Sequence, residues 1–238
     1  MKRVVVIPAR YASTRLPGKP LAKIAGKPLI QWVYERASTS MLKDEVLIAT
    51  DDNRIRDAAI SFGASVVMTS PDCVSGTDRV YEAVKGRDAD IIINLQGDEP
   101  LIRGDMIDAL FSTFEGEPLD MATLCVPLSD KSELETPHTV KVVLDRNGFA
   151  LYFSRSPIPF FQKTSGMPIY KHVGIYGFSR SFLEKFVSLP KGKLEETESL
   201  EQLRALEAGY RIKVLIVDYD GISVDTPEDL ERARLKLS

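Results

Sequence analysis

Short apolar runs recur along the first half of the chain, and polar segments with helical spacing separate them. The runs are rich in valine, isoleucine and leucine, which favours buried strands. Strands are accordingly predicted at residues 4–7, 45–50, 65–68 and 91–95. Helices are predicted between them at residues 28–39, 51–63 and 77–84. Strands that alternate with helices in this way build βαβ units, so the first half of the chain predicts a parallel sheet.

The pattern changes in the second half, where strands follow one another more closely. Strands are predicted at residues 121–126, 139–144, 150–154, 172–178 and 212–217, and helices at 104–114, 180–187, 198–206 and from Pro227 onward. The turn Asp145-Arg146-Asn147-Gly148 suits a type I′ hairpin. The predicted fold class is α/β, a single domain over residues 1–238. It has a mostly parallel sheet, helices on both faces and an antiparallel hairpin extension.

Two stretches of the second half carry further expectations. Residues 156–161 contain two prolines, which exclude a central strand, and two phenylalanines that we expect in a lid or a subunit contact. Residues 162–171 are expected to form a mobile loop. Strand alternation then places His172, Gly174, Tyr176 and Phe178 on one face.

Composition narrows the classes of function. The chain has 31 Lys and Arg against 34 Asp and Glu, a net charge of −3, so no general affinity for nucleic acid or anionic membranes is expected. Cys73 and Cys125 lack CxxC spacing and are expected to be reduced and non-catalytic. The apolar run at 4–7 is too short for a signal peptide, and no run approaches a membrane span. We therefore expect a soluble, cytoplasmic protein.

The loop after the first strand concentrates positive charge. Pro8 is expected to end that strand, and Arg10, Arg15 and Lys19 follow it. In open α/β sheets, ligands bind at the carboxyl ends of the strands. Three cations at such a place favour an anion, with a polyphosphate as the natural candidate. The alternative is a solvated surface loop, which we consider the weaker interpretation because the loop directly follows the strand.

Three further positions are candidates for ligand binding. Thr77 is a plausible N-cap, and Gly76 would let a ligand approach the backbone, although a helix cap alone explains both residues equally well. Asp98 directly follows the strand at 91–95 and is a candidate Mg²⁺ ligand, with a turn or N-cap role as the alternative. Asp225 precedes the helix start Thr226-Pro227, and taken alone it is better explained as a helix-entry acid.

Motifs that would indicate other chemistry are absent from the sequence. There is no GxGxxG after the first strand, no GxxxxGK[ST] phosphate loop and no GxSxG nucleophile motif. Two histidines and two cysteines are too few for a structural zinc site. A cationic loop with carboxylates at strand ends remains, and this combination suits phosphoryl or nucleotidyl transfer.

Six sequence blocks resemble the CMP-KDO synthetase (3-deoxy-manno-octulosonate cytidylyltransferase) family. The blocks are Ile7–Leu21, Gln96–Pro100, Phe153–Arg155, His172–Gly177, Leu200–Arg204 and Val224–Asp229. They extend from the first strand to the last helix. The resemblance implies that CTP and KDO give CMP-KDO and pyrophosphate, a step toward lipopolysaccharide. It also implies a nucleotide-diphospho-sugar transferase (Rossmann-like) fold and a homodimer.

The resemblance also assigns roles to residues. Arg10, Arg15 and Lys19 would clamp the triphosphate, and Asp98 and Asp225 would hold Mg²⁺. Of these, Lys19, Arg15, Asp98 and Asp225 are the expected catalytic residues. The cytidine would be held by the backbone at Ala9 and by Ser75, Gly76, Thr77 and Arg79.

The acid sugar would bind in the later part of the chain. Arg155 would contact its carboxylate, and its hydroxyls would be read by Gln96, His172, Tyr176, Glu201 and Gln202. Residues 150–180 would then form a sugar-binding and dimerisation extension. His172 could instead act as a general base, although a binding role is preferred; without the resemblance, a half-buried sheet face would be the better interpretation. The competing functions are a cytidylyltransferase for sialic acid and a non-catalytic nucleotide sensor.

Overall fold

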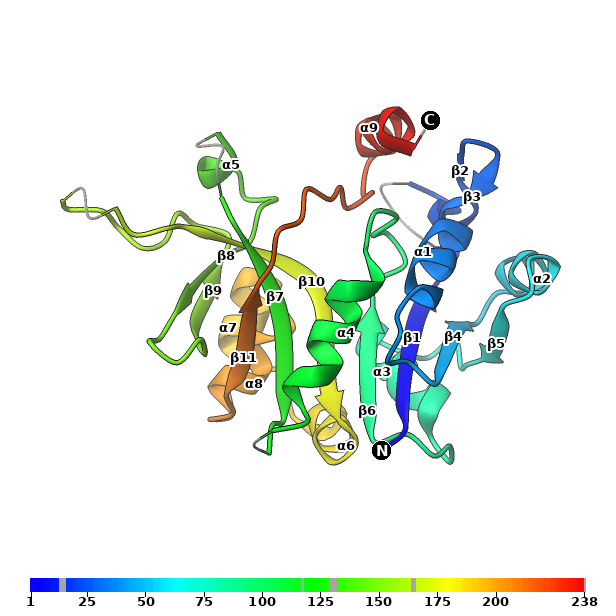
Figure 1. Cartoon of the computed structure of the whole chain (residues 1–238), viewed down its shortest axis with the longest axis horizontal. Coiled ribbons are helices and arrows are strands. Elements are labelled where there is room, and N and C mark those ends of the chain that lie inside the picture. The colour runs from blue at the N-terminus through cyan, green and yellow to red at the C-terminus, as the bar shows by residue number, and fades with distance from the viewer. Residues whose placement is uncertain (13–15, 117, 129–131, 164–165, 238) are drawn as a thin grey trace. The chain divides into compact units, whose positions relative to one another are not determined.

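The structure is a computed structural model that describes residues 1–12, 16–116, 118–128, 132–163 and 166–237 (Figure 1). The chain forms two compact units. Unit 1 comprises residues 1–115 and 220–238, and unit 2 comprises residues 116–219. The expectation of a single domain with an extension at 150–180 stays a prediction, and each unit is described by itself.

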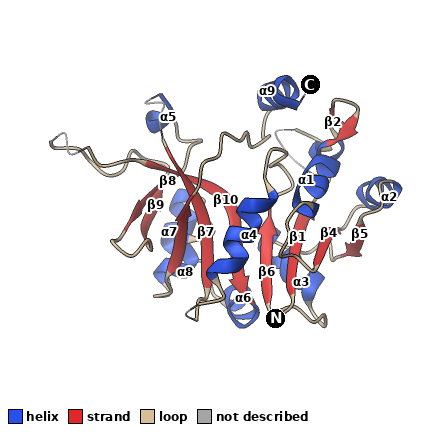
Figure 2. Ribbon diagram, viewed as in Figure 1, coloured by secondary structure: helices blue, strands red, loops and turns tan. Residues whose placement is uncertain are grey.

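Unit 1 contains a parallel sheet with the strand order β6-β1-β4-β5 (Figure 2). Its strands are β1 (Arg3–Ala9), β4 (Glu45–Thr50), β5 (Ser65–Met68) and β6 (Ile91–Leu95). Val5 of β1 is paired with Val46 on one side and with Ile93 on the other. Residues 4–7 are fully buried, as the apolar runs indicate, and the predicted parallel sheet is confirmed.

The first strand differs from the prediction at Pro8. The strand continues through Pro8 to Ala9, because its pairing with β4 extends to Ala9 and Thr50. Its pairing with β6 ends earlier, at Val6 and Asn94. Proline lacks a backbone donor, and here it lies where the strand has a partner on one side only.

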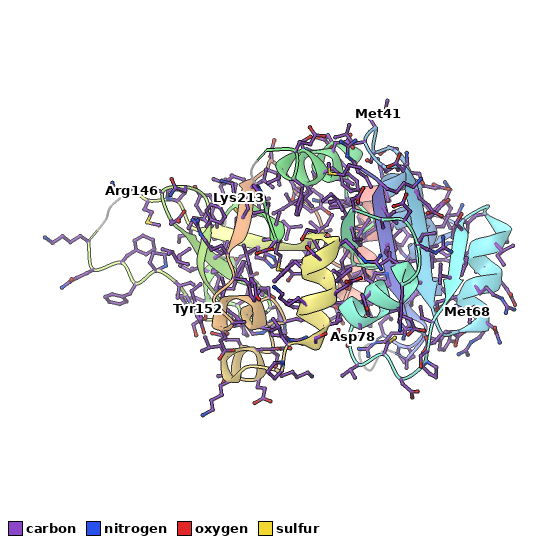
Figure 3. All side chains as sticks on the ribbon, turned by 90° about the horizontal axis from the view of Figure 1, so that it is seen from below. Met41, Met68, Asp78, Arg146, Tyr152 and Lys213 are labelled. Atoms are coloured by element: carbon purple, nitrogen blue, oxygen red, sulfur yellow. The ribbon has the colours of Figure 1, made fainter. Side chains whose placement is uncertain are left out.

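The helices of unit 1 cover both faces of this sheet. They are α1 (Leu29–Ser38), α2 (Asn53–Ser61), α3 (Gly76–Val84) and α4 (Gly104–Thr113), whereas α9 (Pro227–Leu237) packs against Ile24 and Leu29. Figure 3 shows α4 on one face and α3, whose first turn carries the labelled Asp78, on the other. A 3₁₀ helix, η1 (Lys19–Leu21), and a short hairpin of β2 (Lys23–Ile24) and β3 (Lys27–Pro28) complete the unit.

The N-cap predicted for α3 is corrected. Ser75, not Thr77, is the N-cap: its hydroxyl accepts a hydrogen bond from the Asp78 backbone N–H at 3.1 Å. Asp78 in turn accepts from the Ser75 backbone N–H at 2.9 Å, which completes a capping box. A reciprocal pair of bonds satisfies two helix N–H groups, whereas a cap at Thr77 would satisfy one.

The strands of unit 2 form a mixed arrangement. They are β7 (Met121–Pro127), β8 (Lys141–Leu144), β9 (Ala150–Ser154), β10 (Tyr170–Ser179) and β11 (Ile212–Ile216). β7 lies between β11, which is parallel to it, and β10, which is antiparallel. β8 and β9 pair antiparallel around the Asp145–Gly148 turn, as predicted. The residues 170 and 171, expected in a loop, belong to β10 instead because they pair with β7 and β8.

The helices of unit 2 are α5 (Ser132–Glu135), α6 (Arg180–Ser188), α7 (Lys193–Glu198) and α8 (Leu203–Glu207). The single helix predicted at 198–206 is therefore wrong. Ser199 adopts a left-handed conformation with φ of 52°, which ends α7 and starts a turn before α8. Glu201 and Gln202 lie in this turn rather than on a helix face.

Residues 156–161 form no strand, as their prolines predict, and Phe160 is 89% exposed. Their role as a lid or subunit contact stays a prediction. Of the helices in the described ranges, none has the length and apolar character that crossing a membrane requires.

Candidate functional site

A pocket of about 450 Å³ lies in unit 1, where the loops after β1, β5 and β6 meet the segment before α9. This is the edge at which open parallel sheets bind ligands. Its wall consists of residues from these four segments: Pro8, Ala9, Arg10, Lys19, Pro20, Cys73, Val74, Ser75, Gly76, Arg79, Gln96, Gly97, Asp98 and Asp225. Most of the residues predicted for nucleotide binding are therefore brought together.

One ion-pair cluster joins three of the predicted catalytic residues. The Lys19 ammonium lies 2.7 Å from a carboxylate oxygen of Asp98 and 3.0 Å from one of Asp225. Burial disfavours the charged lysine, but the two carboxylates outweigh this effect and raise the pKa of Lys19 above its ordinary value. Lys19 is thus charged at neutral pH.

Two interactions bring Asp225 to Asp98 across the sequence. The Val224 backbone N–H donates to the Asp98 carbonyl at 2.9 Å, which ties the segment before α9 to the end of β6. The Thr226 hydroxyl then accepts from the Asp229 N–H at 3.2 Å, while Asp229 accepts from the Thr226 N–H at 3.0 Å. The predicted cap at Thr226 is confirmed, and it fixes the backbone beside Asp225.

The two aspartates offer the carboxylate oxygens that a divalent cation prefers. Their oxygens converge on a single positive atom, the Lys19 nitrogen. Mg²⁺ is commonly held by one or two carboxylates together with phosphate oxygens and water. Among the described residues there is no group of three or more His, Cys, Asp or Glu side chains that would bind a metal without such help.

The first loop is closed at its base by an aromatic contact. Gly18 adopts φ of 69°, and a Cβ there would lie 3.0 Å from the Tyr11 ring. The Gly18 N–H donates to the Tyr11 carbonyl at 3.1 Å, and the Arg54 guanidinium lies 3.3 Å from the centre of the Tyr11 ring. Arg10 is exposed at the pocket, as expected for a phosphate contact. Arg15 lies outside the described residues.

Two of the residues predicted to hold the cytidine have buried side chains that bind other residues of the protein. Thr77 is 1% exposed, and its hydroxyl accepts from the Asn94 side-chain amide at 3.1 Å. Arg79 is 3% exposed and pairs with Asp51 at 3.3 Å. Arg79 still borders the pocket, whereas Thr77 is not part of its wall.

Gly97 lines the pocket at a place where there is little room for a side chain. At Gly97 a Cβ would lie 3.1 Å from the Pro8 carbonyl oxygen and 3.3 Å from Ile30 Cδ1, so a side chain would push on the end of β1. Gln96, predicted to read the sugar, donates to the Asn94 side-chain carbonyl at 3.1 Å and lines this pocket.

The remaining residues predicted for the sugar lie in unit 2. Arg155 donates from Nε to the Glu198 carbonyl and from Nη1 to the Pro137 carbonyl, both at 2.8 Å. A longer bond of 3.4 Å runs from Nη2 to the Ser199 carbonyl. These bonds use three of the five N–H donors of an arginine, so one donor on each Nη is left for a carboxylate. Arg155 therefore also holds the turn after α7.

His172, Tyr176 and Gln202 form a second polar cluster. The Tyr176 hydroxyl donates to Gln202 Oε1 at 3.0 Å, and the His172 and Tyr176 rings lie 5.4 Å apart. Gln202 is 2% exposed, and its Nε2 has no hydrogen-bond partner among the described residues. A buried amide donor without a partner is costly, which indicates a polar ligand or water at this position. Glu201, beside it, lies 3.7 Å from Arg204.

The tautomer of His172 follows from its neighbour. The Thr123 hydroxyl donates its one proton to the Ile175 carbonyl at 2.7 Å, so at its 2.9 Å contact with His172 Nε2 it accepts. His172 therefore carries its proton on Nε2 and presents an acceptor at Nδ1. Burial lowers the pKa of His172 to about 3, so the ring is neutral near pH 7 and donates no proton to a substrate.

We expect His172 to show no titration between pH 5 and 8, because its folded-state pKa lies below that range. Its ordinary pKa is 6.5, so the unfolded chain takes up the proton first and the stability contributed by this residue declines as pH falls below 6.5. The ring chemical shifts of His172, measured by NMR with His172→Gln as the assignment control, test this. A His172 midpoint near 6.5 would contradict it.

Sequence reasoning did not identify Cys73 and Val74, which line the pocket, or Asn94, which bonds to Gln96 of its wall. Asn94 lies within an apolar strand and is fully buried, and that polar interruption was the signal available. Val74 is 70% exposed at the pocket, and Cys73 is a free cysteine in its wall. Nothing in the sequence around Cys73 or Val74 pointed to the pocket.

Comparisons with known proteins show which family the chain resembles. The family model described as Cytidylyltransferase matches residues 4–213. The 8-amino-3,8-dideoxy-manno-octulosonate cytidylyltransferase of Shewanella frigidimarina (strain NCIMB 400) is 52% identical over 243 residues, covering 100% of this chain and 99% of that protein. The structure of a CMP:2-keto-3-deoxy-manno-octonic acid synthetase complexed with CTP is 48% identical, with a TM-score of 0.95 and 99% and 98% of the two chains covered.

A more distant structure shares the fold alone. The 4-diphosphocytidyl-2C-methyl-D-erythritol synthase of Anaerococcus prevotii DSM 20548 is 14% identical over 99% of this chain and 96% of that one, with a TM-score of 0.66. The predicted α/β fold class is confirmed by these neighbours. With a family model that spans most of its length, and with a lysine and two aspartates gathered at the carboxyl edge of its parallel sheet, the chain belongs to the cytidylyltransferase family.

Proposed function

We propose that this chain transfers CMP from CTP to 3-deoxy-D-manno-octulosonate (KDO) and releases pyrophosphate. The single observation that carries the proposal is the near-complete match, at 48% identity, to the CTP complex of a synthetase for this sugar. The pocket of unit 1 supports it, because it combines the exposed Arg10 and the partly buried Lys19 with two carboxylates. The homodimer and the place in lipopolysaccharide synthesis stay predictions.

The nucleotide would occupy the pocket of unit 1. Arg10 and Lys19 would face the phosphates, together with Arg15 of the same loop. The loop before α3, with Ser75 and Gly76, would be left for the nucleoside. Lys19 is held in place by its two ion pairs before the ligand arrives, and such preorganisation stabilises charge on a departing group.

At the α-phosphorus of CTP, the reaction forms one bond and breaks one. An oxygen of a sugar hydroxyl attacks the α-phosphorus of CTP, and the bond from that phosphorus to the oxygen bridging to the β-phosphate breaks. Pyrophosphate leaves with the electron pair, and the hydroxyl proton passes to solvent. Lys19 stays charged throughout and so neutralises phosphate charge. Asp98 and Asp225 would hold Mg²⁺, which, when bound, adds positive charge next to the phosphates.

The sugar would be read by the polar cluster of unit 2. The side-chain Nε2 of Gln202, which has no partner among the described residues, can donate to a hydroxyl or carboxylate. The Nδ1 atom of His172 can accept from a hydroxyl. Burial raises the pKa of the Tyr176 hydroxyl, which therefore stays protonated and neutral. The two free donors of Arg155 suit the sugar carboxylate.

The 8-amino analogue of KDO is a second candidate substrate. Relatives that are 51 and 52% identical over the full chain carry its name. An ammonium at C8 donates hydrogen bonds and cannot accept any, so it would need acceptors such as His172 Nδ1 or the Glu201 carboxylate. A hydroxyl at C8 has no such requirement.

Pyrophosphate release with CTP and Mg²⁺ tests both candidates. We expect KDO to support turnover, with the 8-amino sugar, sialic acid and buffer run in parallel. If the 8-amino sugar gave the higher kcat/KM, the KDO assignment would give way to it. Turnover with sialic acid alone would make the sugar assignment wrong, and binding of CTP without turnover on any sugar would support a nucleotide sensor.

A further inference from the structure

Helix α3 carries two charged side chains on one face that form hydrogen bonds with the preceding loop, residues 70–75. Arg79 and Glu82 are three positions apart, which places them on neighbouring turns. Arg79 donates to the Ser70 carbonyl at 3.5 Å, while Glu82 accepts from the Ser70 N–H at 2.8 Å. The peptide groups on both sides of Ser70 are therefore tied to one helix.

Glu82 uses both of its carboxylate oxygens on this loop. Oε1 accepts from the Ser70 N–H, and Oε2 accepts from the Cys73 thiol at 3.0 Å. The hydrogen bond from Cys73 lowers the pKa of Glu82, so the carboxylate is charged when it makes these bonds. Hydrogen bonds to an ionised acceptor are stronger than those between neutral groups.

The bonded loop forms one wall of the pocket. Cys73, Val74 and Ser75 all line it, whereas Glu82 itself does not. The side chain of Val74 is 70% exposed there, which gives a mostly polar pocket an apolar surface on which a flat base can lie. The place of that surface depends on the segment between Ser70 and Ser75.

We propose that Glu82 is a positioning residue for the nucleotide: it holds the loop 70–75 so that Val74 and Ser75 face the nucleoside. The inference rests on the proposed function, in which this pocket takes CTP. Glu82 is expected to act on nucleotide affinity and not on the chemical step, since among the described residues its carboxylate bonds to Ser70 and Cys73 and not to Arg10, Lys19 or the two aspartates. Without these bonds the loop would sample more conformations, and ordering it would cost part of the free energy of nucleotide binding.

A series of variants at this position tests the role. Glu82→Ala removes both acceptors, and Glu82→Gln keeps one oxygen for the Ser70 N–H. We expect the Kd for CTP, measured by calorimetry without sugar, to rise about tenfold in Glu82→Ala and less in Glu82→Gln. The kcat and the KM for the sugar should stay near wild type. Asp57→Asn removes an exposed carboxylate of α2 that pairs with the neighbouring Arg56, and it serves as the charge control.

The reactivity of Cys73 provides a readout that does not need catalysis. Burial and the Glu82 acceptor together raise the pKa of the Cys73 thiol to about 12, so alkylation of the wild type should be slow at pH 8. We expect Glu82→Ala and Glu82→Gln to speed alkylation of the Cys73 peptide, followed by mass spectrometry, and Asp57→Asn to leave it unchanged. CTP should slow the reaction in the wild type.

The two readouts separate the inference from the function on which it rests. A wild-type chain that binds no CTP would overturn the proposed function. The Glu82 role would be overturned by a Glu82→Ala chain that binds CTP with wild-type Kd, or whose Cys73 reacts no faster than in the wild type. It would also be overturned if kcat and the KM for the sugar changed as much as the Kd for CTP, because that pattern indicates general damage to the fold.

Discussion

Asp98→Asn is expected to lower turnover by about a thousandfold while the protein stays folded. The substitution keeps the size of the side chain and removes its charge. Lys19 then loses the shorter of its two ion pairs, at 2.7 Å, and the pocket loses one of two carboxylates able to hold Mg²⁺. Pyrophosphate release at saturating CTP and sugar measures the effect.

The control for this variant is Asp105→Asn. Asp105 is an exposed carboxylate of α4 that pairs with Arg103, so it offers the same chemical change away from the pocket. Both variants should show a wild-type circular dichroism spectrum and melt near the wild-type temperature. Turnover retained by Asp98→Asn at ordinary Mg²⁺ concentration would remove Asp98 from the metal site.

Arg204→Met is expected to lower the free energy of unfolding by about 3 kcal/mol. Arg204 and Glu195 form a bidentate pair, with bonds of 2.7 Å from Nε and 2.6 Å from Nη2. The two side chains are only 6% and 9% exposed. Methionine fills much of the same volume, but it leaves the Glu195 carboxylate buried without its partner, and that uncompensated charge is the main cost. Urea denaturation followed by circular dichroism measures the change.

The double variant Arg204→Met/Glu195→Gln separates the pair from the packing. Removing both charges should recover a large part of the loss, because no buried charge then remains. Arg204→Met should also raise the KM for the sugar, since the pair joins α7 to α8 on either side of the turn that carries Glu201 and Gln202. A double variant as unstable as the single one would show that packing, and not charge, is what Arg204 contributes.

Much of the fold could be predicted because its pattern is local. The apolar runs at 45–50 and 91–95 became strands with the predicted bounds, since a fully buried strand needs nothing beyond its own composition. The Asp145–Gly148 turn likewise specified the hairpin of β8 and β9. Thr226 and Asp229 specified the start of α9 through bonds within one turn.

The errors arose where a distant partner decides the local structure. The chain turns at Ser199, and the buried pair of Arg204 and Glu195 joins the two short helices on either side of that turn. Thr77 has good N-cap chemistry, but its hydroxyl is bound to Asn94 of β6, so Ser75 caps the helix. Neither partner can be recognised from residues nearby in the sequence.

The residues of the candidate site likewise differ in whether a local sequence pattern predicts them. Arg10, Lys19 and Asp98 could be proposed because each lies close to the carboxyl end of a predicted strand. Asp225 could not be separated from an ordinary helix-entry acid without the family resemblance. Its place beside Asp98 depends on the backbone bond from Val224 to Asp98, which cannot be predicted from the sequence around Asp225. Glu82 gave no signal at all, because it acts on the loop and not on the pocket.

Gly97 sets a limit on how this pocket can be redesigned. The nearest obstacle to a side chain there is the backbone oxygen of Pro8, and backbone cannot rotate aside as a side chain can. A saturation library at position 97 should therefore return glycine almost alone among active clones. Engineering of nucleotide preference is better directed at the loop 70–75, where Val74 is exposed and a new side chain has room.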